Sequence, residues 1–319
     1  MTKLTLEEFF NNKRDVLALE VLTEDVGLDR EIQGPSISSP GLILAGHTQR
    51  ALAGRLQILG ETELVYLHSL SAEELRRVLQ NFFTLDMPAV VVTKAQDVPP
   101  LMVELARAAH VPVLRTELKT GEFYRRLQPY LEEEFAPRTT MHGSLADVYG
   151  VGLLFVGRSG IGKSECVLDL VERGHRLVAD DLVYITRRGN DVLIGRGHEL
   201  QRHHMEIRGI GIIDISALFG IRAIRLQKRI EVVVQLVDWN EQTSYDRTGL
   251  EAEETEILGV RVPKLTIPLN PGKNITVISE VIAMDHLLKY SGVNAAQRFS
   301  ERLRAAMRPT REYLEEDYE

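Results

Sequence analysis

The sequence predicts a protein of two domains, both of the α/β class. Three observations support this prediction. The chain has 319 residues, 44% of them hydrophobic, which is enough for two separate cores. In its first half, short β-branched runs alternate with helical patterns of about ten residues. Its second half opens on a phosphate-binding motif between a strand pattern and a helix pattern. Because Pro137 breaks a helix that ends at Glu134, we expect domains at residues 1–135 and 136–319.

Composition and charge exclude several classes of protein. The net charge of −8 argues against binding to nucleic acid or to an anionic membrane, because both surfaces carry phosphate. The single cysteine, Cys166, excludes an intramolecular disulfide and a cysteine-based zinc site. No stretch approaches the roughly 20 apolar residues of a membrane span, and the N-terminus lacks an apolar secretion core. We therefore expect a soluble, cytoplasmic protein.

Helix-start signals and strand patterns define the first half. Thr5 followed by Glu8, and Ser71 followed by Glu74, are capping boxes, in which two side chains satisfy free backbone N–H groups at a helix start. The alternation of strand and helix patterns in this half predicts a small, Rossmann-like α/β domain. We assign this domain to assembly or regulation because it lacks a phosphate loop and a dinucleotide fingerprint. The other predicted elements are strands at 89–93 and 111–114 and helices at 100–109 and 121–134. In the last of these helices, the apolar residues Phe123, Leu127 and Leu131 face one way.

The second half is organised around residues 157–164, which match the pattern G-x-x-x-x-G-K-[ST]. An apolar run at 153–156 predicts a buried strand before the motif, and helical spacing predicts a helix after it that ends at Gly174. Backbone N–H groups and the helix N-terminus would face a phosphate there. Lys163 would contact the β- and γ-phosphates of a nucleoside triphosphate, and the Ser164 hydroxyl would ligate Mg²⁺. The residues predicted to bind the nucleotide are Gly157, Arg158, Ser159, Gly160, Ile161, Gly162, Lys163 and Ser164.

Two adjacent carboxylates follow the next strand pattern. The run 176–179 predicts a strand that ends in Asp180 and Asp181. A carboxylate at such a strand end is well placed to hold the Mg²⁺ that bridges two phosphates, and phosphoryl transfer to a hydroxyl also needs a base. If the strand continues, the two side chains point to opposite faces and serve different purposes. The alternative is that one of them caps a turn.

Further patterns extend the sheet of the second half. A hairpin is expected where the turn 188–190 precedes a strand that begins at Asp191. The β-branched run 230–237 predicts a long central strand, and residues 274–281 predict another strand.

Three side chains near residue 205 suggest a metal site. His203, His204 and Glu206 have the composition of one, but adjacent histidines cannot easily reach one metal from an extended strand. Glu206 as a single Mg²⁺ ligand fits hard-cation chemistry better. Arg247 follows in a loop, where it either meets transferring phosphate oxygens or pairs with Asp246 on the surface.

The second half resembles the HPr kinase/phosphorylase family. The resemblance is strong over residues 141–281 and weak over the first half. A phosphate loop alone would leave many functions open. The second glycine-rich segment, at residues 206–213, follows the loop in the order typical of this family and reduces the number of possible functions. The segments that carry the resemblance are Met141-His142-Gly143, residues 157–165, 173–181 and 206–213, Arg247, and Asn270-Pro271-Gly272.

The resemblance implies a bifunctional enzyme that acts on HPr, the small phosphocarrier protein of the sugar phosphotransferase system. Such enzymes use ATP, or pyrophosphate, to phosphorylate a serine of HPr. They reverse the modification with inorganic phosphate and release pyrophosphate. The resemblance also implies a homohexamer and a kinase domain similar to the nucleotide site of phosphoenolpyruvate carboxykinase.

The resemblance also assigns residue roles. Lys163 and the loop amides hold the nucleotide phosphates, and Ser164 and Glu206 ligate Mg²⁺. Asp181 accepts the serine proton and returns it in the reverse reaction, with Asp180 nearer the metal, although the two could exchange these roles. His142 and Arg247 stabilise charge on the transferring group. The loop implied in dephosphorylation consists of Pro268, Leu269, Asn270, Pro271, Gly272 and Lys273.

Two other functions remain open from the sequence. One is a related phosphate-loop kinase for another serine protein or a small hydroxyl metabolite, because the acceptor surface has no short motif. The other is a regulatory or scaffold protein that binds ATP without transfer. The pair Asp180 and Asp181 argues against the second function, because a sensor needs no base.

Overall fold

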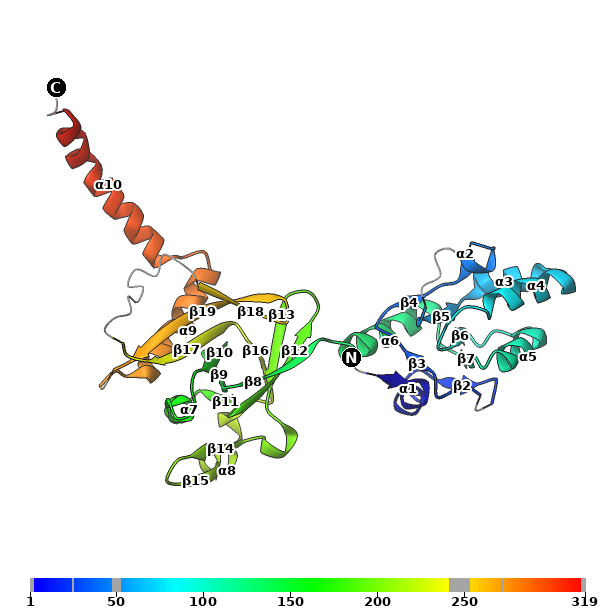
Figure 1. Cartoon of the computed structure of the whole chain (residues 1–319), viewed down its shortest axis with the longest axis horizontal. Helices are drawn as coiled ribbons and strands as arrows, with labels where there is room; N and C mark the ends of the chain where they lie inside the picture. Colours follow the sequence, from blue (N-terminus) through cyan, green and yellow to red (C-terminus); the bar gives the residue numbers. More distant parts are fainter. Residues whose placement is uncertain (1–2, 25, 48–52, 241–252, 271, 317–319) are drawn as a thin grey trace. The chain divides into compact units, whose positions relative to one another are not determined.

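The structure of the chain is a computed structural model, and it describes residues 3–24, 26–47, 53–240, 253–270 and 272–316. The chain divides into two compact units, Met1–Ala136 and Pro137–Glu319. Figure 1 colours the first unit from blue to green and the second from green to red. None of the helices in the described part of the chain combines the length and the apolar composition of a membrane span.

The first unit is built on a five-stranded sheet with the order β2-β7-β6-β5-β4. Strands β4 to β7 run parallel, and β2 is antiparallel to β7 at the edge. A separate pair joins β1 (Leu4–Thr5) to β3 (Glu31–Ile32). The strands of the sheet are β2 (Leu19–Val21), β4 (Ile37–Ser38), β5 (Leu56–Leu59), β6 (Val90–Val92) and β7 (Val113–Thr116).

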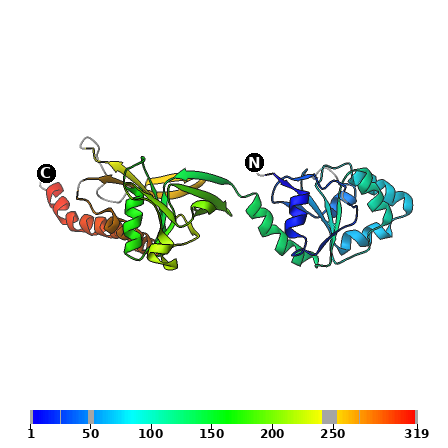
Figure 2. The same ribbon diagram turned by 90° about the horizontal axis from the view of Figure 1, so that it is seen from below.

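Helices cover both faces of this sheet. Along β6, Val91 packs into one core with α1 and α6, whereas Val90 and Val92 pack into another with α3, α4 and α5, because side chains alternate across a strand. Figure 2 shows the blue α1 and green α6 on one side and the cyan helices on the other. The helices are α1 (Leu6–Lys13), α2 (Gly41–Leu44), α3 (Glu61–Ser69), α4 (Ala72–Phe82), α5 (Pro100–Ala108) and α6 (Thr120–Glu134).

Local sequence patterns correctly predict where several of these helices begin or end. Both predicted capping boxes are present, at Thr5 before α1 and at Ser71 before α4. The predicted apolar stripe of α6, formed by Phe123, Leu127 and Leu131, is fully buried. Helix α6 ends at Glu134, before Pro137.

The second unit contains a six-stranded sheet with the order β11-β9-β10-β17-β19-β18. Strands β10, β17 and β19 are parallel, and β9 is antiparallel to both β10 and β11, so β11 runs in the same direction as β10. The predicted central strand is confirmed as β17. The strands are β9 (Ser144–Val148), β10 (Val151–Val156), β11 (Arg176–Ala179), β17 (Val232–Asp238), β18 (Glu253–Ile257) and β19 (Val260–Leu269).

A second sheet of four strands has the order β16-β13-β12-β8. The predicted hairpin is confirmed, because β12 pairs with β13 across the turn at Gly189. Its strands are β8 (Arg138–His142), β12 (Leu182–Arg188), β13 (Val192–Arg196) and β16 (Gln227–Arg229), and a separate hairpin joins β14 (His204–Ile207) to β15 (Gly211–Asp214). The helices of the unit are α7 (Lys163–Glu172), α8 (Ile215–Phe219), α9 (Ile275–Tyr290) and α10 (Ala295–Glu316), with single 3₁₀ turns at Glu199–Gln201 and Ile221–Ala223.

The strand predicted at residues 274–281 is wrong, because these residues begin helix α9. The Asn274 side chain accepts a hydrogen bond from the backbone N–H of Val277 at 3.0 Å, which is an N-cap. Polar side chains then fix the helix to α7, since Thr276 bonds to Asp169 and Glu280 bonds to Arg173. These contacts outweigh the strand preference of the β-branched residues that follow Asn274.

Candidate nucleotide site

The site lies where the carboxyl ends of four strands meet. Strands β11, β10, β17 and β19 run the same way, so the residues that follow each of them lie along one edge of the sheet. Asp180 follows β11, Gly157 follows β10, Asp238 ends β17, and Pro268 lies near the end of β19. The topology therefore gathers the phosphate loop, the paired aspartates and the 268–273 loop at one edge.

The phosphate loop leads from β10 into α7, as predicted. Gly157, Gly160 and Gly162 have φ angles of +151°, +77° and +101°. At Gly157 an added Cβ would lie 2.6 Å from the carbonyl oxygen of Leu236, so only glycine fits there. Lys163 begins the helix, and its Nζ donates to the carbonyl oxygens of Gly157 and Arg158 at 3.1 and 3.0 Å. The lysine side chain therefore lies back over its own loop.

Asp180 joins the phosphate loop to β9 through two serines. Its Oδ1 accepts hydrogen bonds from Ser164 at 2.9 Å and from Ser144 at 2.5 Å. Burial raises the pKa of the Asp180 carboxyl above its usual value, and the hydrogen bonds from the two serines oppose this rise. Ser144 was absent from the residues predicted for the site, although it directly follows the segment Met141-His142-Gly143.

Asp181 has different surroundings from Asp180. The strand does not continue through the pair, because Asp181 adopts a left-handed conformation with φ +64° between β11 and β12. Its backbone carbonyl accepts the N–H of Gly143 at 3.0 Å, and its carboxylate lies 3.9 Å from Nδ1 of His142. The side chains of His142 and Asp181 are 83% and 75% exposed. The structure thus brings these two predicted site residues together at the surface.

Two arginines, one within the phosphate loop and one outside it, fix the position of the loop. Arg158 forms a bidentate ion pair with Asp238, at 2.6 and 2.8 Å, which ties the loop to the end of β17. The guanidinium of Arg208 rests against Gly160, where an added Cβ would lie 2.8 Å from Nη2. The sequence singled out neither Asp238 nor Arg208 as a site residue. The position of Asp238 at the carboxyl end of a central strand is the signal that could have identified it.

Glu206 lies on the exposed face of β14. Its neighbours Met205 and Ile207 are buried in the core beneath the phosphate loop, so the alternation of the strand turns Glu206 away from that core. His204 bonds to the carbonyl of Arg202 at 2.8 Å. Among the residues that the structure describes, no group of three or more His, Cys, Asp or Glu side chains could hold a metal ion.

The two remaining predicted features are only partly within the structure. Pro268 and Leu269, predicted as the start of a loop, are instead the last two residues of β19, where they pair with Val237 and Asp238 of β17. Nζ of Lys273 donates to the carbonyl of Pro268 at 3.0 Å, and the backbone N–H of Lys273 donates to the carbonyl of Asn270 at 3.1 Å. Pro271 and Arg247 lie outside the described residues.

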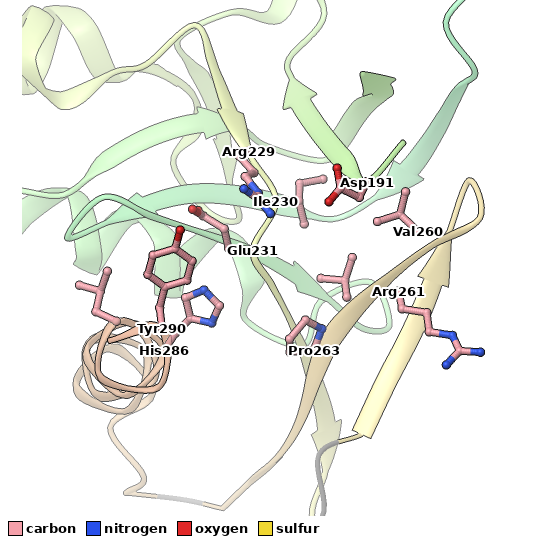
Figure 3. A pocket seen from close by; sticks show the side chains of 11 residues that line it. Asp191, Arg229, Ile230, Glu231, Val260, Arg261, Pro263, His286 and Tyr290 are labelled. Carbon is pink, nitrogen blue, oxygen red and sulfur yellow. The ribbon is translucent and has the colours of Figure 1, made fainter. Parts of the chain in front are cut away.

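A separate cavity of about 390 Å³ lies at the opposite edge of the sheet (Figure 3). It is bounded by Arg229 and Glu231, which precede β17, and by Arg261 at the start of β19. His286 and Tyr290 line it from α9. Burial lowers the pKa of His286, which favours its neutral form. This cavity is distinct from the phosphate-loop site, because it lies at the amino ends of β17 and β19.

Comparisons with known proteins agree on one family. Residues 133–303 match the profile described as "HPr Serine kinase C-terminal domain", and residues 4–131 match "HPr Serine kinase N terminus". A protein of Chloroherpeton thalassium named HPr kinase/phosphorylase is 48% identical over 300 residues, which cover 91% of this chain and 88% of that protein. Its counterpart in Prosthecochloris aestuarii is 42% identical and covers 99% of this chain and 96% of its own length.

A solved structure described as the HPr(Ser) kinase/phosphatase from Coxiella burnetii is also similar. The two chains are 34% identical, and their alignment covers 50% of this chain and 98% of the solved chain, with a TM-score of 0.45. The C-terminal profile spans more than half of the chain, and the two named relatives align over most of their lengths. The chain therefore belongs to the HPr kinase/phosphorylase family.

Proposed function

We propose that this chain transfers a phosphoryl group from ATP to a serine of HPr and reverses the reaction with inorganic phosphate. The observation that carries the proposal is the pairing of Ser164 with Asp180 beside an exposed Asp181. The first two residues present oxygen atoms to a nucleotide-bound cation, and the third is open to a protein acceptor. Family membership supports HPr as that acceptor.

The residues of the phosphate loop suit the nucleotide and its metal. Its backbone N–H groups and Lys163 would hold the phosphates of ATP. The Ser164 hydroxyl and the Asp180 carboxylate are hard oxygen donors within hydrogen-bond distance of each other, which fits Mg²⁺. When bound there, Mg²⁺ would neutralise charge on the β- and γ-phosphates. Glu206 is proposed as a further ligand.

Exposure supports Asp181 rather than Asp180 as the base. A base must reach the hydroxyl of a serine on another protein, and the Asp181 side chain is 75% exposed. Both serine hydroxyls donate to Oδ1 of Asp180, which is half-buried. Asp181 would accept the serine proton in the forward reaction and return it in the reverse one. His142 is close enough to Asp181 to act on the same transferring group.

The remaining assignments complete the proposal. Arg247 would stabilise the transferring phosphoryl group, and the loop at residues 268–273 would act chiefly in dephosphorylation. Residues 136–319 would form a catalytic domain similar to phosphoenolpyruvate carboxykinase. Residues 1–135 would form a Rossmann-like domain for assembly or regulation. We also propose a cytoplasmic homohexamer that binds neither nucleic acid nor membrane, which agrees with its acidic net charge of −8.

Incubation of the purified chain with HPr, Mg²⁺ and ATP labelled in the γ-phosphate tests the substrate assignment. We expect label on one serine of HPr, identified by mass spectrometry. A matched HPr variant in which that serine is alanine should remain unlabelled. Labelling of another protein or metabolite, with HPr unmodified, would refute HPr as the acceptor. Nucleotide binding without any transfer would refute the enzymatic proposal.

A further inference from the structure

A fully buried serine outside the phosphate loop contacts the aspartate of the site. Ser144 is the first residue of β9, and its hydroxyl donates to Oδ1 of Asp180 at 2.5 Å. The same oxygen accepts the hydroxyl of Ser164 at 2.9 Å. Strand β9 lies between β11, which leads to Asp180, and β10, which leads to the phosphate loop. Ser144 is therefore fixed between the two strands whose ends form the site.

The contact between Ser144 and Asp180 affects the orientation of the Ser164 hydroxyl. A serine hydroxyl has one proton and two lone pairs. Ser164 gives its proton to Asp180, so its lone pairs remain available to a cation. This orientation depends on the position of Oδ1 of Asp180. Ser144 supplies a second donor to that oxygen from a residue whose backbone pairs with Phe155 in the sheet. Two donors on one oxygen restrict rotation of the carboxylate more than one donor does.

We propose that Ser144 is a positioning residue for the metal–nucleotide site. Its hydroxyl holds the carboxylate of Asp180 in place and, through it, the hydroxyl of Ser164. Ser144 itself touches neither nucleotide nor acceptor, because it is fully buried. The inference rests on the proposed function only in requiring that this loop binds a nucleotide together with Mg²⁺, so it does not depend on the identity of the acceptor.

The test is a binding measurement on the full chain in the absence of HPr. Ser144→Ala is compared with the wild type in titrations of a fluorescent ATP analogue, each at a series of Mg²⁺ concentrations. Loss of one hydrogen bond to a charged group should raise the half-saturating Mg²⁺ concentration about tenfold. Affinity for the analogue without metal should change by less than about twofold, because the loop amides and Lys163 are untouched.

Ser279→Ala is the matched control. Ser279 is also fully buried in the second unit, but its hydroxyl contacts Cys166 at 3.8 Å and the carbonyl of Ile275 at 2.8 Å rather than Asp180. We expect it to leave the Mg²⁺ dependence unchanged. An equal shift in both variants would assign the effect to general packing and overturn the proposal. An unchanged Mg²⁺ dependence in Ser144→Ala would overturn it as well, as would an equal loss of affinity with and without metal.

This experiment is separable from the labelling of HPr. If HPr is labelled but Ser144→Ala binds Mg²⁺ and nucleotide like the wild type, only the positioning role fails. If the Mg²⁺ dependence shifts as expected and HPr is not labelled, the positioning role stands and the acceptor assignment fails.

Discussion

Asp180 and Asp181 are neighbours in the chain, yet their carboxylates have opposite surroundings. Asp180 accepts two serine hydroxyls on one oxygen, whereas Asp181 is exposed and lies 3.9 Å from His142. The left-handed conformation of Asp181 produces this difference, because it ends the alternation of strand β11 and turns the chain into β12. This difference supports the proposal that Asp180 serves the metal and Asp181 serves proton transfer.

This division of roles predicts different defects in two matched variants. Asp181→Asn should reduce phosphoryl transfer in both directions by about 100-fold or more, which is the contribution of a general base, while Mg²⁺-dependent nucleotide binding persists. Asp180→Asn should instead weaken that binding. Steady-state rates and titrations with an ATP analogue check both variants. If Asp181→Asn turns over like the wild type, Asp181 is not the base.

Lys163→Ala should weaken nucleotide binding by about 10- to 100-fold, because the substitution removes a charge-assisted hydrogen bond to phosphate. Activity should fall at least as far. Isothermal titration with an ATP analogue measures the change in Kd. Lys119→Ala, at an exposed position in the first unit, serves as the control and should behave like the wild type. Normal binding by Lys163→Ala would show that the loop does not hold phosphate.

Glu280 should make the second unit sensitive to acid. The Arg173 guanidinium, with a smaller contribution from His175, lowers the pKa of the buried Glu280 carboxyl below its usual 4.5. The pKa of Glu280 is therefore lower in the folded state than in the unfolded state. The ionised carboxylate stabilises the folded protein fully above pH 4.5, and this stabilisation is lost as the pH falls through the folded-state pKa. Glu280→Gln should lower the free energy of unfolding at neutral pH by about 1–3 kcal/mol. It should also reduce the loss of stability in acid.

Urea unfolding followed by tryptophan fluorescence measures this effect, because the single tryptophan, Trp239, lies in the second unit. The control is Glu253→Gln, which removes an exposed carboxylate 3.9 Å from Lys264 and should change stability by less than about 1 kcal/mol. Equal acid sensitivity in Glu280→Gln and the wild type would show that this carboxylate does not contribute to the pH dependence.

Cys166 should be chemically inert in the native protein. Burial raises the pKa of its thiol to about 12, so almost no thiolate is present at pH 8. We expect iodoacetamide to leave the native chain unmodified and to add a single adduct in denaturant, as measured by intact mass. Rapid alkylation of the native chain would mean that the helix α7 opens or that the thiol is accessible.

Local sequence patterns predicted the features that depend on neighbouring residues. The phosphate loop, both capping boxes and the buried stripe of α6 each depend on contacts within about one or two helical turns. The contacts that were missed join distant parts of the chain. Ser144 and Asp180 are 36 residues apart, and Arg158 and Asp238 are 80 apart.

The same distinction explains the error at α9. Its N-cap, Asn274, is a local signal, but the contact that fixes the helix joins Glu280 to Arg173, 107 residues away. The β-branched residues after Asn274 favour a strand when they are considered without that contact. The pairing of Asp181 with His142 also required the structure, because it depends on the antiparallel pairing of β8 with β12.

The release of pyrophosphate from serine-phosphorylated HPr tests the central claim most directly. The claim is that one phosphate-loop site carries out transfer in both directions. Phosphorylated HPr, Mg²⁺ and inorganic phosphate are incubated with the chain, and pyrophosphate is measured together with unmodified HPr. We predict that both products form in equal amounts, that neither forms without phosphate, and that Lys163→Ala abolishes the reaction. Dephosphorylation that proceeds without phosphate and yields no pyrophosphate would contradict the account.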